Sequence, residues 1–142
     1  MTATRSRDEE KRYKSYLRTL PKDICVFCTG HNEELIEKTA SFKVIRNIFG
    51  YSIWDGQKVA DHLMITPKKH TDTIATFTRT MFAEFHELLS KYEAEGYNIY
   101  ARAPASAVKS IAHHHTHLIK TEGAPKRFVL LSRKPYLRIT AD

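Results

Sequence analysis

The chain of 142 residues has the length of one domain with a single core, and 42% hydrophobic with 27% charged residues is an ordinary globular balance. Two cysteines are too few for a disulfide scaffold, and no apolar stretch approaches the ~18 residues of a membrane helix, so we expect a cytoplasmic protein without membrane contacts. The formal net charge of +7 suits an anionic partner such as a nucleotide or nucleic acid, although many small proteins are equally basic without one.

The first part of the chain predicts a short helix and then a strand. Residues 8–20 begin with acidic side chains and continue with basic ones, which suits the helix macrodipole, and Pro21 is placed to end this helix. Residues 25–29 are expected to form a tight turn, and residues 33–38 favour a further helical turn. Residues 41–49 are rich in β-branched and aromatic side chains and predict a strand.

A hairpin and a long helix follow. Asp55 and the glycine after it are a strong turn signal, and a strand is expected around residues 62–66, where Pro67 ends it. Apolar side chains recur at spacings of three and four over residues 73–95, which predicts one amphipathic helix. Gly96 is placed to end this helix in a left-handed conformation.

The rest of the chain is expected to be mostly strands, with a loop at residues 103–110. The predicted strands are at residues 97–102, 115–121, 126–131 and 136–140. Strands outnumber helices and do not alternate with them, so the predicted fold class is α+β with an antiparallel sheet.

Four of the eight histidines lie within five positions: His113, His114, His115 and His117. Side chains alternate between the faces of a strand, so the first, third and fourth of these would point the same way. Three imidazoles on one face can bind a metal or perform phosphate chemistry. An incidental histidine-rich tract is the alternative, but this cluster is internal, interrupted by Thr116 and flanked by apolar residues.

The cluster and two upstream segments together resemble the histidine triad (HIT) family. Residues 113–119 fit its His-x-His-x-His pattern followed by two apolar residues. Residues 62–70, His-Leu-Met-Ile-Thr-Pro-Lys-Lys-His, are similar to the family's strand that ends in Pro-Lys-x-His. Residues 25–28, Cys-Val-Phe-Cys, are similar to the knuckle of many bacterial members. The resemblance covers about residues 24–121, most of the chain.

This resemblance implies a HIT-like fold, in which an antiparallel sheet of about five strands carries a long helix. The HIT-like domain would comprise residues 23–142, preceded by an N-terminal helical segment at residues 1–22, within a single domain overall. The implied activity is hydrolysis of a phosphoanhydride or phosphoramidate bond at a nucleotide's α-phosphate, as in dinucleoside polyphosphate or nucleoside phosphoramidate hydrolases. The product would be a nucleoside monophosphate. Relatives commonly form twofold dimers, so a homodimer is expected by analogy.

The resemblance also implies roles for individual residues. His115, the middle histidine, would be the nucleophile that forms a covalent nucleotidyl-histidine, which water then hydrolyses. His117 would contact phosphate, and a histidine there favours hydrolysis because the transferase branch has glutamine. Ser110 stands where the family has a donor to phosphate on the leaving-group side. Lys109 beside it would neutralise a polyphosphate leaving group, or is simply a solvated lysine.

Three further residues are candidates for nucleotide binding. Arg102 stands where relatives often carry an amide side chain, and an arginine there could hold a longer anionic chain or be exposed on its strand. Asn47 stands where the family has an Asn or Asp that holds the ribose. It is separated from His62 by more residues than is usual, so Asp55 within that segment is a competing candidate.

Cys25, Cys28, His70 and His113 match the positions that hold zinc in zinc-bearing relatives. Two thiolates and two imidazoles form a common structural zinc set. All four ligands would come from the protein, so the zinc would hold the cysteine turn against the sheet and would not act as a Lewis acid. A redox pair or two buried thiols are the alternatives for the cysteines.

A second function is a zinc-stabilised basic module that binds nucleic acid without catalysis. It would use the N-terminal segment and the basic pairs at residues 126–127 and 133–134, and it would explain the net charge. It leaves the spacing of the histidines unexplained. A nucleotide substrate is therefore favoured over a nucleic-acid partner.

Overall fold

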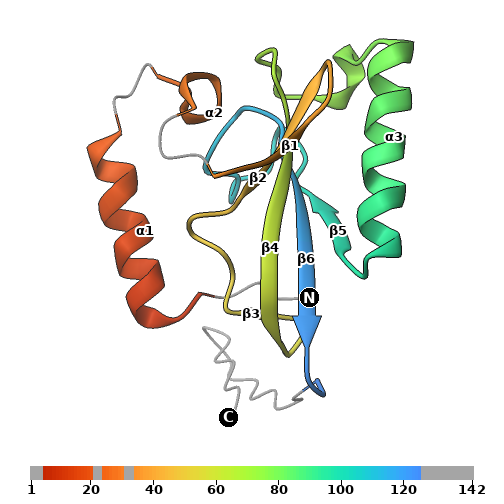
Figure 1. The fold of residues 1–142 in the computed structure, drawn as a ribbon. Coiled ribbons are helices and arrows are strands. Elements are labelled where there is room, and N and C mark those ends of the chain that lie inside the picture. The colour runs from red at the N-terminus through yellow and green to blue at the C-terminus, as the bar shows by residue number, and fades with distance from the viewer. Residues whose placement is uncertain (1–4, 21–23, 31–33, 126–142) are drawn as a thin grey trace.

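A single antiparallel sheet forms the centre of the computed structural model, which describes residues 5–20, 24–30 and 34–125 (Figure 1). Within these residues, neighbouring strands follow the order β1-β2-β4-β6-β5, and β3 pairs with β4. The strands are β1 (Leu35–Lys38), β2 (Phe42–Arg46), β3 (Ile53–Trp54), β4 (Gln57–Pro67), β5 (Asn98–Ala101) and β6 (Thr116–Glu122). The long strand β4 is therefore central, because it pairs with β2, β3 and β6.

Helices lie on both sides of this sheet. They are α1 (Arg7–Thr19), α2 (Val26–Thr29) and α3 (Arg79–Ala94), with a 3-10 turn at Ile74–Thr76. In Figure 1, α1 and α3 flank β4 and β6 from opposite sides. The predicted α+β class is thus confirmed, with six strands in the described residues where about five were expected. None of the helices in the described ranges is long and apolar enough to span a membrane.

The main hydrophobic core lies between the sheet and α3. Side chains alternate along a strand, and Leu63 and Ile65 of β4 point to the same face as Leu118 of β6. They belong to one buried cluster with Leu88 and Tyr92 of α3. This packing buries the apolar stripe predicted from the spacing along residues 73–95.

The opposite face of the same strands carries a second core. Met64 packs there with Ile45 of β2 and Phe27 of α2. Met64 lies directly opposite His117 in the pairing of β4 with β6. Because directly paired residues share a face, this register places His117 on the side of the sheet away from α3.

Local sequence signals explain how several elements end. Asp55 has a φ of 50° and Gly56 a φ of 77°, the conformation of a tight two-residue hairpin turn between β3 and β4. The Thr78 side chain accepts a hydrogen bond from the Met81 backbone N–H and caps α3. Gly96, with a φ of 87°, follows the end of this helix. The predicted turn and the predicted helix end are both confirmed.

The predicted N-terminal helix is confirmed to within one residue at each end. Ser6 precedes α1 and forms a reciprocal capping box with Glu9, and the first turn is acidic. Pro21, which was expected to end the helix, lies outside the described residues, as do the predicted strands at 126–131 and 136–140 and the basic pairs near them.

Two predicted elements differ from the structure. The helical turn expected over residues 33–38 is wrong, because Leu35–Lys38 instead pairs with the edge of β2 as strand β1. The single helix expected over residues 73–95 is interrupted before α3. Thr73 and Thr78 each accept a hydrogen bond from a backbone N–H two or three residues ahead, so each starts its own helical segment.

Candidate functional site

A cavity of about 280 Å³ lies on the face of the sheet away from α3. Side chains of α1, α2, β2, β4, the loop before β6 and the histidine cluster line it. His115 and His117 both line the cavity, and their rings meet edge to face with centroids 5.0 Å apart. The volume is close to the lower end of the ~300–1,000 Å³ typical of small-molecule sites. The cavity therefore combines space for a small ligand with two imidazoles.

The predicted alternation of the histidines holds, although β6 begins only at Thr116. His113 and His115 both pack against Phe27, with ring centroids 5.8 and 5.3 Å away. His114 points to the other side and packs edge-on against Phe77 of the main core, at 5.8 Å. The cluster is thus divided among three environments: the cavity, the core and the neighbourhood of the two cysteines.

His115 has the tautomer that a nucleophile requires. Its Nδ1 lies 2.8 Å from the His113 carbonyl oxygen. A carbonyl only accepts, so Nδ1 carries the proton and donates it, which leaves a lone pair on Nε2. Burial lowers the pKa of His115, the hydrogen bond to His113 opposes this, and the positive charges of Lys109 and Arg102 lower it further. The ring is therefore neutral near pH 7.

His117 is oriented by a second buried imidazole, that of His62. The Tyr51 backbone N–H donates to His62 Nδ1 at 3.0 Å, so the His62 proton must be on Nε2. That Nε2 lies 2.9 Å from His117 Nδ1 and donates to it. The His117 proton is consequently on Nε2, where it is a hydrogen-bond donor. Burial lowers the pKa of His62 to about 3 and holds that of His117 well below its usual value, so both rings are neutral.

The other predicted residues around the triad also line the cavity, except Asp55. Arg102 lies with its guanidinium carbon 5.3 Å from the ring centroid of Tyr100. Lys109 lines the cavity and donates to the Asp72 carbonyl oxygen at 3.2 Å. Asp55 is exposed in the turn between β3 and β4 and is not part of the cavity lining.

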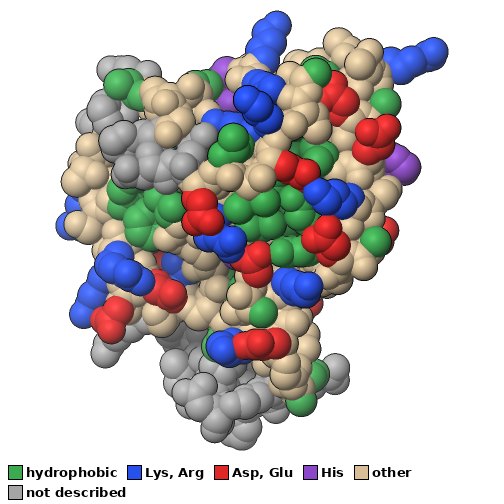
Figure 2. Space-filling view, viewed as in Figure 1, with side chains coloured by type: hydrophobic (Ala, Val, Ile, Leu, Met, Phe, Trp, Pro, Cys, Tyr) green, Lys and Arg blue, Asp and Glu red, His purple; other side chains and the backbone are tan. Residues whose placement is uncertain are grey.

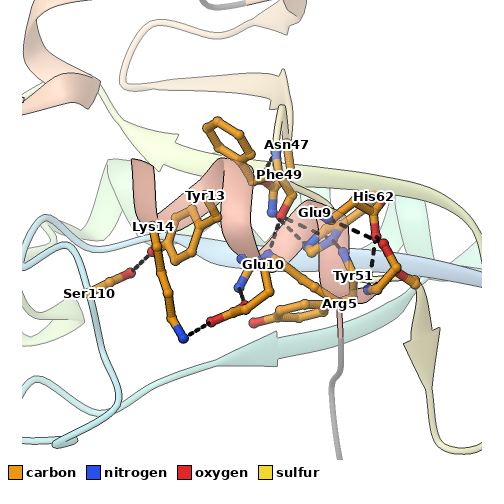
Figure 3. Close-up of polar contacts among 12 residues, drawn as sticks. Arg5, Glu9, Glu10, Tyr13, Lys14, Asn47, Phe49, Tyr51, His62 and Ser110 are labelled. Carbon is orange, nitrogen blue, oxygen red and sulfur yellow. Dashed lines mark hydrogen bonds and ion pairs between the residues drawn. The ribbon is translucent and has the colours of Figure 1, made fainter. Parts of the chain in front are cut away.

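Two of the cavity-lining residues are engaged with protein groups. The Ser110 hydroxyl accepts a hydrogen bond from the Tyr13 hydroxyl of α1 (Figure 3). Asn47 follows β2, and its Oδ1 accepts from the Phe49 backbone N–H at 3.0 Å, while its own backbone N–H donates to the His62 carbonyl oxygen at 2.9 Å. Asn47 thus helps to shape the loop after β2 and to hold it beside His62.

The four predicted metal ligands come together beside the cavity. One ligand atom from each of Cys25, Cys28, His70 and His113 lies within 4.8 Å of all the others. The His113 Nδ1 is 3.3 Å from Cys25 Sγ and 3.5 Å from Cys28 Sγ, and His70 Nδ1 is 3.3 Å from Cys28 Sγ. A tetrahedral zinc with ordinary bond lengths would place sulfur and nitrogen ligands about 3.6 Å apart.

The hydrogen bonding of His113 also fits a metal ligand. Its Nε2 donates to the Pro67 carbonyl oxygen at 3.0 Å, at the end of β4. The proton is therefore on Nε2, and the lone pair of Nδ1 faces the two sulfurs. Metal-bound histidines usually have such a partner on the other ring nitrogen. The residues thus fit a structural zinc that would join α2 to the end of β4.

Three residues of the site had no predicted role: Arg5 and Tyr13, which line the cavity, and His62, which contacts His117. His62 had a weak signal, since it is the first histidine of the segment that resembles the family's strand. Arg5 and Tyr13 had none, because their place depends on how α1 docks. The Arg5 Nε donates to the Phe49 carbonyl oxygen at 2.9 Å, which brings the start of α1 to the loop after β2.

Several solved structures with a similar fold are named as histidine triad or HIT family proteins. A HIT family hydrolase from Clostridium thermocellum is 17% identical, with a TM-score of 0.54 over 78% of this chain and 100% of that one. A hypothetical histidine triad nucleotide-binding protein from Sulfolobus tokodaii is 23% identical, with a TM-score of 0.53 over 70% of this chain and 71% of that one. A zinc-bound histidine triad family protein from Mycobacterium smegmatis is 21% identical, with a TM-score of 0.52 over 69% of this chain and 75% of that one.

Searches against family models and against curated proteins gave no match. The similarity to known proteins is therefore found in the fold and not in the overall sequence. The predicted HIT-like fold is confirmed: this chain has the fold of the histidine triad proteins.

Proposed function

We propose that this protein is a HIT-type nucleotide hydrolase. It cleaves a phosphoanhydride or phosphoramidate bond at the α-phosphate through a nucleotidyl-His115 intermediate and releases a nucleoside monophosphate. The observation that carries the proposal is the His115 ring, which lines a cavity, is neutral, and has its proton on Nδ1. The names of similar solved proteins, a HIT family hydrolase and a histidine triad nucleotide-binding protein, support the same class of activity.

The first step is attack by the imidazole. The Nε2 lone pair of His115 forms a bond to the α-phosphorus while the bond from phosphorus to the leaving group breaks, and the leaving group departs with that electron pair. The ring becomes positively charged as the new bond forms, and the hydrogen bond from its Nδ1 to the His113 carbonyl stabilises this charge. Water then attacks phosphorus and releases a proton to solvent, while the electron pair of the P–N bond returns to Nε2 and restores the neutral ring.

The surrounding donors stabilise the phosphate charge during both steps. His117 donates from Nε2, because His62 fixes its tautomer. Arg102 and Lys109 line the same cavity and supply positive charge close to His115. Donors that are already oriented where charge develops contribute most to rate enhancement, because they do not reorganise during the reaction.

We also propose a structural zinc held by Cys25, Cys28, His70 and His113. When bound, zinc supplies a rigid link and no reactive group, because protein atoms fill all four positions. The link would keep Phe27 of α2 against His115; the centroids of the two rings are 5.3 Å apart. The zinc-bound solved protein with the same fold supports this assignment.

The face of the described residues shown in Figure 2 gives no support to the nucleic-acid module. On the face shown in Figure 2, Lys and Arg side chains alternate with Asp and Glu side chains, and the described residues in view present no continuous basic patch. Proteins that bind nucleic acid without catalysis depend on such patches.

A comparison of His115→Ala with wild type tests the proposal. Nucleoside monophosphate release is measured with adenosine phosphoramidate, diadenosine triphosphate, diadenosine tetraphosphate and adenylated lysine. Wild type should turn over at least one of these, and His115→Ala should lose roughly 10³-fold or more in kcat, as expected when a nucleophile is removed. His86→Ala, which removes an exposed histidine of α3, is the matched control and should keep wild-type activity.

Two results would contradict the proposal. One is a wild-type protein, correctly folded and zinc-loaded, that releases no nucleoside monophosphate from any of the four compounds. The other is a His115→Ala variant that retains turnover. Salt-sensitive binding of a polyanion that is equal in both proteins would then favour the nucleic-acid module.

A further inference from the structure

Helix α1 forms one wall of the cavity and is fixed there by contacts along its length. At its start, the Ser6 backbone N–H donates to the Ser52 hydroxyl oxygen at 2.7 Å, and that hydroxyl donates to the Glu9 carboxylate. Further along, the rings of Tyr13 and Tyr16 pack on Phe49 with centroids 5.5 and 4.9 Å away. These contacts join α1 to the loop that follows β2. Residues of α1 are therefore positioned to contact a ligand in the cavity.

Arg5, just before α1, is held inside this cavity (Figure 3). Its guanidinium carbon lies 4.1 Å from the ring centroid of Tyr13 and 5.1 Å from that of Tyr51. Its Nε donates to the Phe49 carbonyl oxygen, and the side chain is only 16% exposed. Two aromatic rings and one carbonyl thus fix the direction of the guanidinium group.

The terminal nitrogens of Arg5 are available to a ligand. The closest carboxylate among the described residues is that of Glu10, at 3.7 Å from Nη1, which is too long for a hydrogen bond. No described residue accepts a hydrogen bond from either terminal nitrogen. A guanidinium group offers a planar pair of donors that matches two phosphate oxygens. Glu10 is thus an ion-pair partner that accepts no hydrogen bond from Arg5, and the terminal N–H groups keep their donors for an anionic ligand.

The positive charges of the cavity are distributed around the two catalytic imidazoles. Lys109 lies near enough to His115 to lower its pKa, and Arg5 does the same for His117 and His62. The charge of Arg102 lowers the pKa of both His115 and His117. Glu10 is the only acidic residue in the described lining. Arg5 lies 5.1 Å from the Tyr51 ring, whose centroid is 5.5 Å from that of His117, and all three residues line the same cavity as His115. A phosphate at His115 therefore leaves the Arg5 donors for another anionic group.

We propose that Arg5 is a specificity-determining residue that binds a second phosphate of the substrate. The preferred substrates are then nucleotides with at least two phosphates, over a nucleoside phosphoramidate that carries only the scissile one. This inference rests on the proposed function for the position of the scissile phosphate. A substrate without the second phosphate would leave the terminal N–H groups of Arg5 without an acceptor, although the side chain is only 16% exposed, and buried donors without an acceptor are a strong source of discrimination.

Substitutions of Arg5 test this specificity. Arg5→Gln removes the charge, and Arg5→Lys keeps the charge but loses the paired donors. Arg18→Gln makes the same change at an exposed residue of α1 outside the cavity and is the matched control. Values of kcat/KM are measured for diadenosine tetraphosphate and adenosine phosphoramidate, and thermal unfolding is measured for each variant.

Arg5→Gln should lower kcat/KM for diadenosine tetraphosphate roughly 10- to 100-fold, mostly through KM, as expected for loss of a charge-assisted contact. It should change the value for adenosine phosphoramidate by less than about threefold. Arg5→Lys should show a smaller loss of the same selectivity, and Arg18→Gln should match wild type with both substrates. Equal losses with both substrates, or no loss with either, would overturn the inference. If Arg5→Gln unfolds, the selectivity of Arg5→Lys decides between these results.

Binding separates this inference from the proposed chemistry. In a His115→Ala background, titration calorimetry with AMP and ADP should show that ADP binds roughly tenfold tighter, and Arg5→Gln should remove that preference. If ADP binds more tightly than AMP but wild type turns over none of the substrates, the role of Arg5 is supported and the hydrolase proposal fails. Turnover with equal affinities for AMP and ADP would refute the role of Arg5 while the hydrolase proposal stands.

Discussion

Replacing His62 with glutamine separates the two properties of this buried imidazole, its hydrogen bonds and its titration. His62 accepts from the Tyr51 backbone N–H and donates to His117. Glutamine offers an acceptor and a donor of similar reach, so it preserves both partners, but it does not titrate. We therefore expect His62→Gln to lie within about 1 kcal/mol of wild type in unfolding free energy at pH 7.

Wild type and His62→Gln should differ in stability at acidic pH. Burial lowers the pKa of His62 from 6.5 in the unfolded chain to about 3 in the fold; Arg5 lowers it further, and Asp61 opposes the shift. Between these pH values the unfolded chain binds more protons than the folded one. The contribution of neutral His62 to stability is therefore complete above about pH 6.5 and is lost progressively as the pH falls toward 3. Linkage gives a loss of about 2 kcal/mol between pH 7 and pH 5.

Urea unfolding at pH 7 and pH 5 measures this loss. The single tryptophan, Trp54, is 3% exposed and stacks with Tyr51, next to His62, so its fluorescence reports on this region. Wild type should lose about 2 kcal/mol more than His62→Gln between the two pH values, in the same zinc-containing buffer. His86→Gln, which removes an exposed histidine, should behave as wild type. An equal loss in wild type and His62→Gln would refute the burial of a neutral His62.

Three further outcomes are expected. Thr78→Ala should lower the unfolding free energy measured in urea by about 1 kcal/mol, because it removes the cap of α3. Thr78→Ser should recover most of that free energy, because serine keeps the hydroxyl. An alanine variant as stable as wild type would exclude a capping role. Leu118→Ala should cost about 2–5 kcal/mol, because this fully buried side chain lies in the main core, and a loss below about 1 kcal/mol would be inconsistent with that position. Protein purified without chelators should contain about one zinc per chain by metal analysis. Cys28→Ser should lower both the zinc content and the melting temperature. A wild-type protein that is purified without metal, and whose melting temperature does not change when zinc is added, would refute the zinc site.

Much of the site could be predicted because its residues lie close in sequence or belong to strands with a clear register. The alternation along residues 113–117 separates His114, which packs on Phe77, from the histidines on the other face. The four metal-ligand positions were predictable only from the combination of three motifs, since no spacing joins Cys25 to His113. The register of β4 and β6 brings His70 and His113 together, and the packing of Phe27 of α2 on the sheet brings the two cysteines to them.

Other features depend on contacts that local patterns do not contain. The Leu35–Lys38 segment is a strand because the edge of β2 is available, and a single turn of helix has too few hydrogen bonds to compete. Asp55 fitted a ligand role by composition, but its turn leaves it exposed and away from the cavity. Arg5 and Tyr13 enter the site only because α1 packs on Phe49, a contact between segments more than thirty residues apart.

The most direct test of the central claim is mass spectrometry of the protein during turnover. The reaction is stopped in base within milliseconds, because a phosphorus–nitrogen bond to histidine is labile in acid, and the protein is digested and its peptides are sequenced. A nucleoside monophosphoryl group should be found on His115 in wild type and should be absent from His115→Ala. The same group on His113, His114 or His117, or rapid turnover with no modified histidine, would contradict the mechanism.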